Sequence, residues 1–110
     1  MNMILSNIAN EVTNFYAEQF GGKLNQVWLF GSQINGGNTH DDSDVDVMVV
    51  VDGDMVMSTG YNDAKYDLVM DMLRKYNEMV SIIVTGSKEF NNSGKSIYNN
   101  VKKGSLVYEK

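Results

Sequence analysis

The sequence predicts one α/β domain spanning residues 1–110, because helical and strand-like hydrophobic patterns alternate along the whole chain. A second observation is the apolar run VDVMVVV at 45–51, which is typical of a strand buried on both faces of a sheet. The third is the length, since 110 residues without a repeat or a linker can bury one modest core. The expected order is helix, strand, loop, strand, helix, strand, helix, strand.

The N-terminal part is predicted to contain a helix at 3–20 and a strand at 26–30. Apolar residues recur three or four positions apart through the helix, and the glycines Gly21 and Gly22 supply its stop. The strand, QVWLF, ends at the Gly-Ser pair that follows it.

The C-terminal part begins with the strand at 45–51 and a DGD turn. Helical spacing, short apolar runs and glycine positions then predict the remaining elements. They are a helix at 61–76, a strand at 79–84, a turn of helix at 87–90, a helix at 96–103 stopped by a left-handed Gly104, and a strand at 105–109.

The composition excludes several kinds of site. The chain has no cysteine, which excludes disulfides, thiol nucleophiles and cysteine-bound zinc, and its single histidine, His40, cannot build a histidine metal cage. The net charge of −5 argues against direct nucleic-acid binding, which depends on cations that neutralise phosphates. No signal peptide or membrane-spanning run is recognised, so we expect a cytoplasmic protein without a membrane partner.

The segment FGSQINGGNTHDDSDVD, from Phe30 to Asp46, contains the candidate site. Ser32 follows a glycine at the end of a strand, where a serine commonly caps a helix and free backbone N–H groups favour phosphate. Gly31 lets the backbone approach a ligand closely. Gly31, Ser32 and Ser43 are therefore the candidate phosphate-binding residues, with hydrogen bonding inside the loop as the alternative for Ser43.

Asp44 and Asp46 are the candidate metal ligands and catalytic residues. On a strand their side chains share one face, with Cα atoms roughly 6.6 Å apart at about 3.3 Å per residue. Such carboxylates can hold one metal ion or a pair, and Mg²⁺ prefers one or two carboxylates together with water and substrate phosphates. A phosphate-binding loop beside them predicts phosphoryl or nucleotidyl transfer. The structural alternative is a solvated acidic turn that begins a strand.

The residues FGSQINGGNTHDDSDVDVMVVVD, at 30–52, resemble the Gly-Ser and Ser-Asp-x-Asp signature of the polymerase-beta-like nucleotidyltransferases. The resemblance is to the minimal nucleotidyltransferases of bacteria and archaea in particular. It covers essentially the whole chain, from the helix before VWLFGS to the ending IYNNVKKGSLVYEK. It implies a small mixed sheet of about four strands with helices packed on it.

The resemblance also implies the chemistry. In the family the first two carboxylates bind Mg²⁺ and the Gly-Ser pair contacts the nucleotide phosphates, which matches Asp44 and Asp46, and Gly31 and Ser32. The reaction moves a nucleoside monophosphate from an NTP, expected here to be ATP, to an acceptor hydroxyl. Members of the minimal group are often paired with a HEPN-type partner protein, which they modify as antitoxins.

Two departures from the family pattern bear on activity. The motif INGG lacks a phosphate-facing arginine, and Ser81 stands where catalytic members carry a third carboxylate. Serine can neither act as the base nor supply negative charge. Glu78 lies three residues away, an odd strand spacing that points to the opposite face, and Asp52 and Asp54 lie at the far end of their strand.

Two hypotheses therefore stay open. In the first, Asp44 and Asp46 suffice for Mg²⁺-dependent transfer of a nucleoside monophosphate. In the second, the chain is a catalytically degenerate module that binds nucleotide or a partner protein without transfer, because Ser81 replaces the third carboxylate.

Two features outside the motif also have two interpretations each. Lys102 and Lys103 either offset the dipole at a helix end or contact phosphate or RNA. Tyr66 and Met70 either pack in the core or form an apolar patch for a partner.

Overall fold

The computed structural model describes residues 2–31, 44–60 and 62–110, and it confirms the predicted α/β class. Tyr61, the predicted first residue of the second long helix, lies outside the described residues. The elements are α1 (Met3–Phe20), the short 3-10 helix η1 (Gly21–Lys23), β1 (Leu24–Phe30), β2 (Val45–Val51), α2 (Asp63–Tyr76), β3 (Val80–Gly86), α3 (Ser87–Asn92), α4 (Ser96–Lys102) and β4 (Ser105–Glu109).

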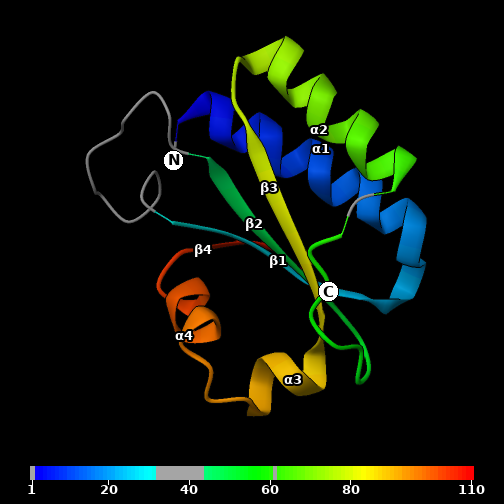
Figure 1. Ribbon diagram of the computed structural model, residues 1–110, viewed down its shortest axis with the longest axis vertical. Helices are drawn as coiled ribbons and strands as arrows, with labels where there is room; N and C mark the ends of the chain where they lie inside the picture. The colour runs from blue at the N-terminus through cyan, green and yellow to red at the C-terminus, as the bar shows by residue number, and fades with distance from the viewer. Residues whose placement is uncertain (1, 32–43, 61) are drawn as a thin grey trace.

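The strands form one mixed sheet in the order β3-β2-β1-β4. β1 runs antiparallel to both β2 and β4, whereas β2 and β3 are parallel, with α2 in the crossover between them. Figure 1 shows α1 and α2 on one face of the sheet, with α3 and α4 on the other. The last residues of β1 and the first residues of β2, β3 and β4 therefore meet at one end of the sheet.

Alternate residues of β2 enter two different cores, which confirms the predicted burial on both faces. Val45, Val47 and Val49 pack with α1 and α2, whereas Met48 and Val50 pack with α3 and α4. Because side chains alternate along a strand, Asp46 shares the face of Met48 and Val50.

Two glycines that were predicted to stop helices do so in different ways. Gly21 has a φ of 57° and ends α1, as predicted. The prediction of a left-handed Gly104 is wrong, since its φ is not positive. A Cβ at Gly104 would lie well within 3.0 Å of the carbonyl oxygen of Leu29 and 3.0 Å from Cα and Cβ of Phe30, so this glycine permits close approach of the chain to β1.

Tyr66 does not pack in the core. Its exposed fraction is 56%, because the buried stripe of α2 runs through Lys65, Leu68, Val69 and Met72 instead. Buried packing is therefore wrong for Tyr66, and the apolar patch for a partner stays a prediction.

Glu11 of α1 forms hydrogen bonds that link this helix to α2. The Lys75 ammonium donates to Oε1 of Glu11 at 2.8 Å, and the Tyr76 hydroxyl donates to Oε2. These bonds, the one from Lys75 first and then the one from Tyr76, lower the pKa of the Glu11 carboxyl below its ordinary value of 4.5.

We expect Glu11→Gln to lower the free energy of unfolding at pH 7 by roughly 0.5–1 kcal/mol, since the ion pair is partly exposed. A lowered folded-state pKa stabilises the fold above the unfolded pKa, and this contribution is lost as the pH falls through the folded pKa. The difference between wild type and variant should therefore shrink in acid. Urea unfolding at pH 7 and pH 3 measures it, with Glu18→Gln on the same helix as the control. A pH-independent difference would contradict this assignment.

Candidate functional site

The predicted site residues that the structure describes gather at one end of the sheet. Phe30, the last residue of β1, pairs with Asp46 in β2, and Asp46 is in register with Ser81 in β3. Gly31 follows Phe30, and Asp44 immediately precedes β2. Backbone pairing thus brings together three segments that are far apart in the sequence.

Gly31 and Asp46 are in direct contact. Gly31 has a φ of 97°, a conformation that residues with a side chain rarely adopt. A Cβ at Gly31 would lie within 3.0 Å of Oδ2 of Asp46, so the carboxylate occupies the space that any other residue would fill. The sequence predicted Gly31 as a phosphate-binding residue but missed its contact with the second aspartate.

The Asp46 carboxyl is half-buried, and its environment disfavours its negative charge. Burial is the larger effect that raises its pKa above the ordinary value of 3.8, and the nearby charge of Asp44 raises it further. Asp44 itself is exposed. Two carboxylates that repel each other in this way are suited to a divalent cation, which would replace their repulsion with attraction.

Asp44 and Asp46 supply only part of the coordination that a metal ion needs, so water or substrate would supply the other ligands. Among residues 2–31, 44–60 and 62–110, no group of three or more aspartate, glutamate, histidine or cysteine side chains could hold a metal ion. Two carboxylates with open positions fit Mg²⁺, which usually keeps several waters and binds through one or two carboxylates plus substrate phosphates. Asp44 and Asp46 are the residues that would hold it.

Ser81 lies beside Asp46, at the position where the resemblance to the nucleotidyltransferases implies a third carboxylate. In-register neighbours on adjacent strands share a face of the sheet, so the side chain at position 81 lies on the same face as that of Asp46. Glu78 is half-buried and lies two residues before Val80, the first residue of β3. Asp52 lies at the opposite end of β2, where its carboxylate accepts hydrogen bonds from Asn25 and Lys110.

Two of the predicted phosphate-binding residues, Ser32 and Ser43, lie outside the described residues. The same holds for His40 and for the motif INGG. The phosphate-binding roles of Ser32 and Ser43 stay predictions.

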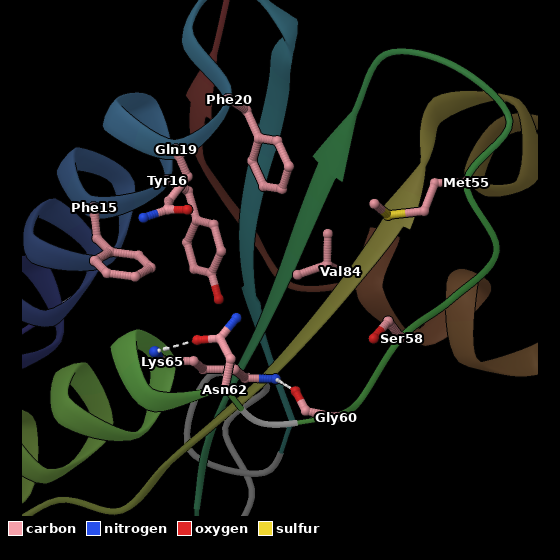
Figure 2. A pocket seen from close by; sticks show the side chains of 10 residues that line it. All are labelled: Phe15, Tyr16, Gln19, Phe20, Met55, Ser58, Gly60, Asn62, Lys65 and Val84. Atoms are coloured by element: carbon pink, nitrogen blue, oxygen red, sulfur yellow. Dashed lines mark hydrogen bonds between the residues drawn. The ribbon is translucent and has the colours of Figure 1, made fainter.

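A cavity of about 190 Å³ lies elsewhere, on the α1 and α2 side of the sheet. Figure 2 shows the side chain of Tyr16 in α1 pointing toward Lys65 of α2, and Phe20 is a further aromatic residue of the lining. The Lys65 ammonium donates to the carbonyl oxygens of Gly60 and Ile82, and burial lowers its pKa. Sequence reasoning missed this buried lysine, although its spacing from the apolar residues of α2 places it on their stripe. The cavity is lined by none of the predicted site residues.

The helices in the described part of the chain are not membrane spans. None combines the length and the apolar character that a crossing requires.

Comparison with known proteins gives both a family and a fold. The sequence pattern of the family described as "Polymerase beta, Nucleotidyltransferase" matches residues 10–110. A search of curated proteins finds no match. The structure resembles a toxin–antitoxin crystal structure with AMP-PNP, at a TM-score of 0.58 and 18% identity over 93% of this chain and 73% of the other.

Two further solved structures have the same fold. A mutant of the toxin–antitoxin complex MntA-HpeT matches with a TM-score of 0.57 and 16% identity, over 93% of this chain and 73% of the other. A protein of Sulfolobus solfataricus described as a nucleotidyltransferase matches with a TM-score of 0.52 and 22% identity, over 98% and 81%. At these identities the likeness shows the fold alone. Since the family pattern covers nearly the whole sequence, the chain belongs to the polymerase-beta nucleotidyltransferase family.

Proposed function

We propose that the chain is a Mg²⁺-dependent nucleotidyltransferase that moves a nucleoside monophosphate from an NTP, with ATP the expected one, to an acceptor hydroxyl. The observation that carries the proposal is the convergence of Asp44, Asp46 and Gly31 at one end of the sheet. Family membership supports the reaction class, and the likeness to a toxin–antitoxin structure with AMP-PNP supports an adenine nucleotide.

In this proposal the chain's own residues position and desolvate the reacting groups. Asp44 and Asp46 hold the metal ion, which neutralises charge on the phosphates when it is bound. Gly31 has no side chain and so leaves room for the Asp46 carboxylate, and its backbone can approach the phosphates closely. Ser32 and Ser43 are proposed to hydrogen-bond the phosphates. The acceptor oxygen then attacks the α-phosphorus, and pyrophosphate leaves.

We propose that the acceptor belongs to a HEPN-type partner protein, which the chain modifies as an antitoxin. Support comes from the fold likeness to proteins crystallised as toxin–antitoxin complexes. The acceptor hydroxyl must lose its proton, and Ser81 beside Asp46 offers no carboxylate to receive it. Proton removal is therefore the step that we expect to limit the rate in this chain.

The absence of a carboxylate at position 81 favours a second candidate function. A module that binds Mg²⁺ and nucleotide without transferring it needs only the two aspartates, whereas transfer ordinarily uses a third carboxylate to activate the acceptor. Ser81 is the observation in favour of this candidate.

A labelling assay separates the two functions. The chain is incubated with Mg²⁺, a HEPN-type partner and ATP labelled at either the α- or the γ-phosphate. Transfer of a nucleoside monophosphate labels the partner from α-labelled ATP alone, and EDTA abolishes the labelling. Nucleotide binding without labelling after long incubation would establish the non-catalytic module and overturn the proposed transfer. Label from γ-labelled ATP would indicate a different reaction.

A further inference from the structure

We propose that Lys103, which follows the last residue of α4, binds the phosphates of the nucleotide in this site. The inference rests on the proposed function and adds to it a specific cation from the C-terminal part of the chain. It assigns Lys103 the role that an arginine or lysine of the phosphate-binding loop would otherwise have.

A triphosphate presents several negative charges, and enzymes that transfer nucleotides position cations against them in addition to the metal ion. The sequence from Gly31 to Asp46 contains four aspartates and neither lysine nor arginine. A cation that assists the phosphates must therefore come from another element.

In the antiparallel pairing of β1 with β4, Leu29 is opposite Ser105. Gly104 comes next, packed against the backbone of Leu29 and Phe30. Lys103 is the C-cap residue of α4 and immediately precedes Gly104, so its backbone comes close to Phe30, the neighbour of the Gly31 that contacts the Asp46 carboxylate. The tight packing of Gly104 fixes this part of the chain at the site.

Every lysine and arginine of the chain lies within the described residues. Four of these side chains are paired with carboxylates: Arg74 with Asp71, Lys75 with Glu11, Lys95 with Glu89 and Lys110 with Asp52. Lys65 is buried on the other side of the sheet. Lys23 precedes β1 and Lys88 follows β3, so both lie at the opposite end of the sheet from the site.

The two lysines at the end of α4 differ. The Lys102 ammonium lies 5.0 Å from the centroid of the Phe90 ring, a cation–π contact that folds its side chain against α3. Lys103 is exposed and forms no ion pair with the described residues. A lysine on a flexible aliphatic stem can reach a phosphate beside its own backbone. Of the two, Lys103 is the one whose ammonium has neither an ion pair nor a ring contact among the described residues.

The test measures the affinity for Mg²⁺-ATP by isothermal titration calorimetry in wild type, Lys103→Gln and Lys88→Gln. The control removes the same charge at the opposite end of the sheet. We expect Lys103→Gln to weaken Mg²⁺-ATP binding about tenfold, as loss of a charge-assisted hydrogen bond does, and Lys88→Gln to leave it unchanged. Lys103→Arg should retain most of the affinity. The loss of affinity caused by Lys103→Gln should be smaller for AMP than for ATP.

The results also separate this inference from the proposed function. Equal affinities of Lys103→Gln and wild type, with binding abolished in Asp44→Asn/Asp46→Asn, would overturn the role of Lys103 and leave the site intact. Equal weakening by Lys88→Gln would indicate a general charge effect and would also overturn it. A lower melting temperature of Lys103→Gln with unchanged affinity would overturn the proposal and show that Lys103 only stabilises the C-terminal end of α4. Absence of binding in wild type would overturn the proposed function itself.

Discussion

Replacing Gly31 by alanine is expected to remove most of the site's affinity for Mg²⁺-nucleotide while leaving the chain folded. The added Cβ meets the Asp46 carboxylate, which is the end of a side chain and can rotate away. The backbone at φ 97° becomes strained, at a cost of about 1–3 kcal/mol. Displacement of a metal-binding carboxylate should weaken binding roughly 10–100-fold, the range seen when the support of a metal ligand is lost.

Two other glycines provide matched controls for Gly31→Ala. Gly21 also has a positive φ, but a Cβ there meets nothing within 4 Å, so Gly21→Ala measures backbone strain alone. Gly94 has neither a positive φ nor a neighbour within that distance, so Gly94→Ala should be nearly neutral. Urea unfolding should show similar losses for Gly21→Ala and Gly31→Ala, whereas calorimetry should show weakened nucleotide binding for Gly31→Ala alone. Unchanged binding in Gly31→Ala would contradict the assigned contact with Asp46.

Replacing Ser81 by aspartate is expected to raise the rate of nucleotide transfer about 100-fold or more, the contribution of a positioned general base. Ser81 is in register with Asp46 on the adjacent strand, so the new carboxylate would lie beside the existing pair. There it can bind the metal and accept the proton of the acceptor hydroxyl. The measurement is the initial rate of labelling of a HEPN-type partner from α-labelled ATP.

The control for this substitution is Ser81→Asn, which has nearly the same shape as aspartate and no charge. Without metal, Ser81→Asp should be less stable than Ser81→Asn, because a third negative charge joins Asp44 and Asp46. Mg²⁺ should then raise the melting temperature of Ser81→Asp more than that of Ser81→Asn. If Ser81→Asp labels the partner no faster than Ser81→Asn, the loss of the third carboxylate is not what limits transfer.

The sequence predicted the strands best where burial alone determines the pattern. β2 has the predicted bounds, 45–51, because it is apolar along its length and enters both cores. β3 extends to Gly86, two residues beyond its predicted end, because parallel pairing carries Thr85 and Gly86 alongside β2. Polar and small residues at the end of a strand give no hydrophobic signal of this extension.

The candidate site was predictable as a list of residues but not as a set of contacts. The Gly-Ser and Asp-x-Asp spacings indicated Gly31, Asp44 and Asp46 from local chemistry. The contact between Gly31 and Asp46 depends on one backbone angle and on the register of two strands, which no local pattern encodes. The approach of Gly104 to Leu29 depends in the same way on the pairing of β4.

The most direct test of the account is an amide NMR titration of the ¹⁵N-labelled chain with Mg²⁺-ATP, in wild type and in Asp44→Asn/Asp46→Asn. We expect saturable shifts centred on Gly31, Asp44, Asp46 and Ser81 in wild type, and their loss in the variant. EDTA should reverse the shifts. Unchanged spectra at millimolar Mg²⁺-ATP, or equal shifts in the variant, would contradict the assignment of a metal-dependent nucleotide site to these two aspartates.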